Sequence, residues 1–271
     1  MDMNNPAKLK NLSEYKKWLA NEHKIENLDE HANHYDSVAH KILRDFSDSN
    51  YWKNILKEFE NINDKYLLKT GHHLFLPEIT PKLTIKKFDD FLLKTFRKNV
   101  INNDNWPSEC IDGWILPQNW FVRIKDIVRT DFVVKYLDGV EFLINEITSL
   151  SEAEGLQVDI SLEAREEGYY AAHVDVKNEF EIPTLIHKTE KINTSIEIQI
   201  TTQLQEVIKK LLHKHYRERR KKIKEPDIMW QWDYKSTKFS TNYLGHILHY
   251  IEGLIVDVRE KQRGEKNDKR I

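Results

Sequence analysis

The hydrophobic period changes twice along this chain of 271 residues, and that change is what most constrains the fold. From about Ala7 to Thr70, apolar residues recur at three- and four-residue steps, which predicts three amphipathic helices ending before Gly71. Segments with strand character follow, and helical spacing returns from Gln203 onward. This order of segments predicts an α+β fold with a mixed sheet, in which helices precede and follow the strands along the chain.

Five segments have the β-branched and aromatic composition, or the alternation, of half-buried strands. We expect strands at residues 121–124, 132–136, 157–162, 169–176 and 195–200. We expect further helices at residues 88–96, 137–147, 203–224 and 241–263, and a loop at 102–119.

These patterns divide the chain into three parts. Residues 1–80 form an N-terminal helical region, residues 81–225 form the α+β core, and residues 226–271 form a C-terminal helical extension. In the extension, Trp230 and the apolar residues from Tyr243 to Ile255 either pack the last helix onto the body or form a subunit interface.

Composition excludes several classes of protein. Charged residues make up 32% of the chain but nearly balance, with a net charge of −2, so any affinity for nucleic acid must come from a local patch. Cys110 is the only cysteine, which excludes a disulfide or a cysteine zinc site within one chain and fits a cytoplasmic protein. No segment approaches the roughly 18 apolar residues that a membrane span needs. No glycine-rich phosphate loop is present, so a nucleotide would be bound by side chains.

Two acidic residues lie on or beside strand candidates. Asp126 precedes the strand at 132–136, and Glu197 lies among alternating isoleucines whose side chains should point into a core. Two carboxylates on neighbouring strands can hold Mg²⁺, and a metal held in this way can bridge nucleotide phosphates. The pattern predicts phosphoryl or pyrophosphoryl transfer, and ordinary solvated or salt-bridged carboxylates are the alternative.

Three short motifs contain or separate these acids. Asp126 begins the run Asp-Ile-Val-Arg-Thr-Asp, Glu197 begins Glu-Ile-Gln-Ile-Thr-Thr, and residues 168–173 read Gly-Tyr-Tyr-Ala-Ala-His. They resemble the D-x-x-G-x-R, E-I-Q-I-R-T and G-Y-R-S-x-H motifs of the synthetase domain of the RelA/SpoT family, which includes small alarmone synthetases and their toxin relatives. Upstream, Lys86, Lys94 and Arg97 have the spacing of that family's R-x-K-x-x-x-S-x-x-x-K-x-x-R segment. The resemblance covers about residues 86–220, half of the chain.

The resemblance implies a nucleotidyltransferase-like synthetase core and an activity. Members transfer pyrophosphate from ATP to the 3′-hydroxyl of GDP or GTP, with Mg²⁺ as cofactor, and thereby make the alarmones of the stringent response. Some toxin relatives instead act on adenine nucleotides or on the 3′ end of tRNA. The resemblance leaves two possible protein partners open: an antitoxin, or a second copy of the chain.

The resemblance also implies roles for individual residues. Asp126 and Glu197 would bind the metal, and Glu197 would help to deprotonate the attacking hydroxyl. The acceptor would contact Tyr169, His173 and Gln199. The ATP phosphates would contact four basic residues: Lys86, Lys94, Arg97 and Arg129.

The chain departs from the family pattern mainly at arginines. Thr84, Asp131, Tyr170 and Thr201 stand where the family has arginine, and Asp90 replaces the serine of the phosphate segment. Arg123, Lys125, Arg129 and Arg165 are the candidates to replace the missing cations, because guanidinium can bind phosphate from several directions. These departures favour an altered acceptor, with a catalytically degenerate nucleotide- or partner-binding protein as the alternative.

A basic run lies in the helix expected at 203–224. Residues 209–224 contain nine lysines and arginines and a single acid, Glu218. A run of this kind is either a solvated helix face or a docking surface for a polyanion such as tRNA.

Overall fold

A five-stranded mixed sheet forms the centre of the protein, in the strand order β1-β2-β5-β4-β3. The computed structural model describes residues 7–77, 80–186, 188–220 and 229–268, with the side chains of 212–220 and 264–268 outside that description. The strands are β1 (Thr84–Ile85), β2 (Val128–Val134), β3 (Val158–Ala164), β4 (Tyr170–Pro183) and β5 (Thr189–Thr202). Only β2 and β5 pair in parallel, and the other pairs are antiparallel. The α+β fold expected from the sequence is therefore confirmed.

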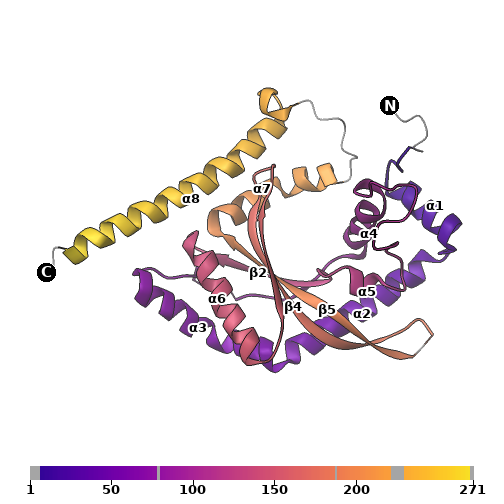
Figure 1. Ribbon diagram of the computed structural model, residues 1–271, viewed down its shortest axis with the longest axis horizontal. Coiled ribbons are helices and arrows are strands. Elements are labelled where there is room, and N and C mark those ends of the chain that lie inside the picture. The colour runs from indigo at the N-terminus through magenta and orange to yellow at the C-terminus, as the bar shows by residue number, and fades with distance from the viewer. Residues whose placement is uncertain (1–6, 78–79, 187, 221–228, 269–271) are drawn as a thin grey trace.

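Helices precede the sheet, interrupt it and follow it (Figure 1). They are α1 (Leu12–His23), α2 (Leu28–Asp48), α3 (Asn50–Thr70), α4 (Phe88–Phe96) with the π-helical turn η1 (Arg97–Ile101), α5 (Trp120–Arg123), α6 (Asp138–Ala153), α7 (Gln203–Arg220), the short turn η2 (Trp230–Trp232) and α8 (Thr237–Asp268). Within the described residues, none of these helices is long and apolar enough to cross a membrane.

The N-terminal helices share one hydrophobic core with the sheet. Buried side chains run without interruption from Tyr15 and Phe46 in the helices to Ile198 in the central strand. Local signals define the helix ends, because Ser49 accepts a hydrogen bond from the Trp52 amide at the start of α3. At the other end of α3, Gly71 adopts φ +78°, which confirms the predicted stop.

The expected strand at 121–124 is wrong, because residues 121–123 belong to the helical turn α5 and Ile124 is the extended residue that follows it. The carbonyl of Asn119 accepts hydrogen bonds from the amides of Val122 and Arg123, which closes the turn. Trp120 and Phe121 are buried, and Trp120 packs edge-on against Phe91 of α4 with ring centroids 5.2 Å apart. The aromatic residues that suggested a strand therefore anchor a turn in the core instead.

The hairpin of β4 and β5 is longer than the sequence suggested. Its pairing continues from Ala172↔Ile200 to Pro183↔Thr189, well beyond the expected strands at 169–176 and 195–200. Phe180 and Ile192 are buried opposite each other in this extension, which explains why polar residues around them still form strands. The last helix begins at Thr237, before the expected residue 241, and α7 is described only as far as Arg220.

Alternation in the central strands gives the sheet one apolar and one polar face. Ile196, Ile198 and Ile200 are fully buried in the core, so Glu197 and Gln199 between them face the opposite side. The same alternation in β4 separates the buried alanine and valines from His173 and Asp175, which are aligned with Gln199 and Glu197. The polar face of β4 and β5 carries the candidate site.

Candidate active site

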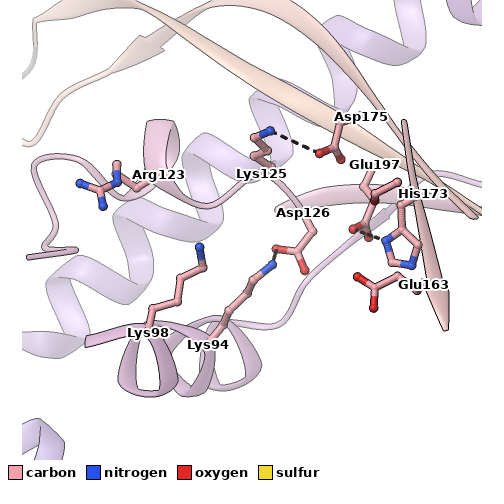
Figure 2. Close-up of a pocket in the computed structure, with 10 residues that line it drawn as sticks. Lys94, Lys98, Arg123, Lys125, Asp126, Glu163, His173, Asp175 and Glu197 are labelled. Atoms are coloured by element: carbon pink, nitrogen blue, oxygen red, sulfur yellow. Dashed lines mark hydrogen bonds and ion pairs between the residues drawn. The ribbon is translucent and has the colours of Figure 1, made fainter. Parts of the chain in front are cut away.

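A pocket of about 210 Å³ lies on the polar face of the sheet (Figure 2). Its lining residues are Lys94, Lys98, Arg123, Lys125, Asp126, Ser161, Glu163, His173, Asp175 and Glu197. The basic residues come from α4, η1 and the segment at α5, and the sheet strands supply His173 and most of the acids. Asp126 is the exception, because it comes from the basic side of the pocket and pairs with Lys94. A pocket with a cationic wall and an acidic wall can hold a phosphate chain and a metal side by side.

Glu197 is held firmly within this pocket. It is only 8% exposed, and its two carboxylate oxygens accept hydrogen bonds from Nδ1 of His173 (3.0 Å) and from Nε2 of Gln199 (2.5 Å). Burial alone would raise the pKa of Glu197, but these hydrogen bonds outweigh burial and hold the pKa below its ordinary value. The carboxylate is therefore ionised and oriented near neutral pH.

Asp126 faces the same pocket from the loop between α5 and β2. It is 6% exposed and pairs with two ammonium groups, those of Lys86 and Lys94 (2.7 Å to the latter). Despite burial, the two lysines lower the pKa of Asp126 well below its usual range. The pKa of Lys86 is lowered, because its burial and the positive charge of Lys94 outweigh the attraction of the Asp126 carboxylate. Pairing of β1 with β2 brings Lys86 to this position, since its amide donates to the carbonyl of Ile127 at 2.9 Å.

The donor set fits a magnesium ion only in part. Among the described residues, no group of three or more His, Cys, Asp or Glu side chains is arranged to hold a metal. Mg²⁺, however, is commonly bound by one or two carboxylates together with water and substrate phosphates. Asp126 and Glu197 supply such a pair of carboxylates on one pocket, and a metal on Asp126 would compete with Lys86 and Lys94.

The residues expected to contact the acceptor are divided between two places. His173 and Gln199 both bind Glu197 and thus belong to its immediate support. Tyr169 lies just before β4 and does not line the pocket, and the guanidinium of Arg165 lies 5.3 Å from the centre of its ring. One face of the Tyr169 ring is therefore covered by a cation, and burial raises the pKa of its hydroxyl.

The residues expected to bind ATP phosphates are also rearranged. Lys94 lines the pocket, and Lys98, four residues later, lines it too, whereas Arg97 does not. Residues four apart lie on one helix face, so the spacing of Lys94 and Lys98 in the sequence could have indicated that Lys98 faces the same side as Lys94. Lys86 reaches Asp126, and Arg129 is aligned with Glu197 across the parallel β2–β5 pair.

Of the proposed replacement cations, two reach the pocket. Lys125 pairs with Asp175 (3.6 Å) and with Asp159 (3.2 Å), and Arg123 pairs with Asp112 (3.8 Å). Sequence reasoning did not anticipate Asp175, although strand alternation places it on the same face as His173. Burial and the nearby Glu197 carboxylate raise the pKa of Asp175.

The basic run of α7 is described only at its start. Lys209 pairs with Asp131 (2.8 Å) and Glu206 (3.5 Å), and Lys210 pairs with Glu206 (3.4 Å). These cations are therefore partly neutralised within the chain. The side chains of the remaining cations, Lys214, Arg217, Arg219, Arg220, Lys221, Lys222 and Lys224, lie outside the described residues.

Comparison with known proteins identifies the fold. No protein-family model matches the chain, and no curated protein matches it in sequence. Among solved structures, it is similar to small alarmone synthetase 1 from Bacillus subtilis and to the same enzyme bound to its product pppGpp. Each has a TM-score of 0.50 and 15% identity, over 78% of this chain and 92% of that chain. Small alarmone synthetase 2 from the same organism has 17% identity and a TM-score of 0.46 over 78% of this chain and 93% of its own. The expected synthetase fold is thereby confirmed.

Proposed function

Starting from the fold of a RelA/SpoT-like synthetase domain, we propose that this chain is a pyrophosphokinase. It transfers pyrophosphate from ATP to the 3′-hydroxyl of a nucleotide or of a tRNA 3′ end, with Mg²⁺ as cofactor. The observation that carries the proposal is the placement of Asp126 and Glu197 on one pocket that basic residues also line.

In the proposed reaction, Glu197 is the proton acceptor. The acceptor's 3′-oxygen forms a bond to the β-phosphorus of ATP, the bond from that phosphorus to the oxygen bridging to the α-phosphorus breaks, and AMP leaves with that oxygen. The hydroxyl proton passes to Glu197, whose ionised form His173 and Gln199 stabilise.

The basic wall would bind the phosphates of ATP. Lys86 and Lys94 lie at Asp126, and Lys98 extends the row by one helical turn. Negative charge in the transition state is spread over the phosphoryl oxygens, and these ammonium groups are placed to offset it. Magnesium, held by Asp126, Glu197 and the phosphates, would supply further neutralisation of that charge.

Two classes of acceptor fit the proposal. Small alarmone synthetase 1 from Bacillus subtilis was solved with its product pppGpp, which supports a guanine nucleotide as acceptor. The basic run at 209–224 supports an RNA acceptor instead, and modification of the tRNA 3′ end would make the protein a translation-inhibiting toxin with a cognate antitoxin as partner.

A catalytically inactive nucleotide-binding protein is the second candidate. It is favoured by the ion pairs that occupy Asp126 and by the cation that covers Tyr169. Either arrangement would have to open before a metal or an acceptor base could bind there.

The test is a transfer assay with γ-labelled ATP, resolved by thin-layer chromatography. GDP, GTP, ADP, ATP and bulk tRNA are offered separately, with and without Mg²⁺, and Glu197→Gln serves as the matched inactive variant. Label transferred to one acceptor by the wild type but not by the variant supports the proposal. Binding of ATP with no transfer to any acceptor would refute it in favour of the second candidate.

A further inference from the structure

The last helix, α8, contacts the rest of the chain through a polar face. Asn242 and Glu252 are almost fully buried (1% and 4% exposed), and His249 stacks on Tyr170 with ring centroids 3.7 Å apart. Further along, Arg259 pairs with Asp138 at 2.5 Å and donates a hydrogen bond to the Tyr66 hydroxyl at 3.2 Å. These four positions are separated by seven, three and seven residues, that is, by one or two helical turns, so they lie on one side of the helix.

The apolar side of α8 faces outward. Leu244, Ile247, Ile251, Leu254 and Val258, which we call the α8 stripe, follow a strict alternation of three- and four-residue steps. Tyr243, Tyr250 and Ile255 lie beside the stripe. All eight side chains are between 36% and 67% exposed. In Figure 1, α8 is the outermost element on its side of the molecule. An amphipathic helix normally buries its apolar face, and here the orientation is reversed.

Close packing prevents α8 from rotating about its axis to bury the stripe. Gly245 lies directly against Gly168, where a Cβ atom on Gly245 would fall 2.2 Å from the Gly168 carbonyl oxygen. Gly168 itself adopts φ +79°, a conformation that glycine accommodates readily. The glycine contact and the Arg259–Asp138 ion pair, about four turns apart on the helix, both specify the same rotation.

We propose that the α8 stripe is the interface for a second copy of this chain, the two stripes packing against each other as a two-stranded coiled coil. The stripe has an average period of 3.5 residues. Apolar residues with this period form the contact line of a two-stranded coiled coil, in which side chains of one helix insert between side chains of the other. The same surface serves both copies, as two-fold symmetry requires. The inference does not rest on the proposed activity.

Size and charge both favour a second copy over a charged partner. A whole large side chain has a surface of about 150–250 Å². Multiplied by the exposed fractions of the eight side chains, the lower end of this range gives an exposed surface on the order of 600 Å². A stable interface buries about 800 Å² on each partner, so the stripe and its polar margins approach that requirement. Asp257 and Lys261, two charged residues of the same helix near the end of the stripe, pair with each other at 2.6 Å, and the stripe itself contains no charged residue to select a charged ligand.

The primary test is the molar mass of the full chain, measured by light scattering during size-exclusion chromatography and by sedimentation over a dilution series. The test variant is Ile247→Glu with Leu254→Glu. The control carries the same chemical change at two exposed apolar residues elsewhere, Leu68→Glu with Ile111→Glu. Far-ultraviolet circular dichroism establishes that each variant is folded.

We expect the wild type and the control to be dimers, and the stripe variant to dissociate at least about 100-fold more readily, because association would bury unpaired carboxylates. A wild type that stays monomeric at every concentration overturns the proposal, as does a stripe variant that dimerises as tightly as the wild type.

A second measurement does not depend on charged variants folding. In a Cys110→Ser background, which removes the only cysteine, Ile251→Cys places a single thiol at the middle of the stripe. Mild oxidation should give a disulfide-linked dimer with Ile251→Cys and far less with Leu68→Cys, which is exposed on α3. Equal cross-linking of the two variants would show that the stripe is not an interface.

Discussion

Asp126 provides a direct test of the electrostatics of the pocket, through the variant Asp126→Asn. The substitution keeps the shape of the side chain but leaves Lys86 and Lys94 around a neutral group. Removing one partner from a buried ion pair typically costs about 3–5 kcal/mol. Lys94 is about one-third exposed, so water recovers part of the loss, and we expect the free energy of unfolding to fall by about 3 kcal/mol at pH 7.

The loss of stability in Asp126→Asn should become smaller as the pH falls. The folded-state pKa of Asp126 is lowered, so its stabilising contribution is complete above the unfolded-state pKa and declines as the pH falls toward the folded-state pKa. With an unfolded-state pKa near 3.9 and about 1.4 kcal/mol per pH unit, the difference between wild type and variant should narrow by roughly 1 kcal/mol between pH 7 and pH 3.

The measurement is urea unfolding of both proteins at the two pH values, with Asp104→Asn, an exposed aspartate, as control. The control should stay within about 0.5 kcal/mol of the wild type. The reasoning would be refuted by a variant as stable as the wild type at pH 7, or by a difference that is equally large at pH 3.

Four further predictions concern catalysis and the packing of α8. Glu197→Gln should reduce kcat by about 10²- to 10⁴-fold with unchanged circular dichroism, and a smaller loss would remove Glu197 as the base. His173→Ala should move the acidic limb of the pH–rate profile to higher pH, because burial would then raise the pKa of Glu197; an unmoved limb contradicts that link. Lys98→Ala should raise the apparent KM for ATP by about 10-fold and more than Arg97→Ala does, so the reverse order would return the phosphate role to Arg97. Gly245→Ala should lower the melting temperature, because its Cβ would collide with backbone, and an unchanged value would show that α8 is not docked as described.

Much of the site could be predicted from local sequence. The alternation around Glu197 predicted a strand with one buried face, which is confirmed, because the alternation reports which face of the strand is buried. Asp126 was expected beside a strand, and it directly precedes β2, which pairs with β5. Both acids line one pocket in the structure, and their catalytic roles remain predictions. Gly71 marked the end of α3 by its backbone freedom alone.

Contacts between distant segments decided the rest. Residues 121–124 have strand composition, yet residues 121–123 lie in the helical turn that packs Trp120 against Phe91. Pairing of β4 with β5 brought Asp175 beside Glu197, and the course of α4 and η1 turned Lys98 rather than Arg97 toward the pocket. The apolar period of α8 is plain in the sequence and predicts which residues share a face. It does not determine whether that face points inward, because the rotation of α8 depends on Gly168 and Asp138, which lie far away in the chain.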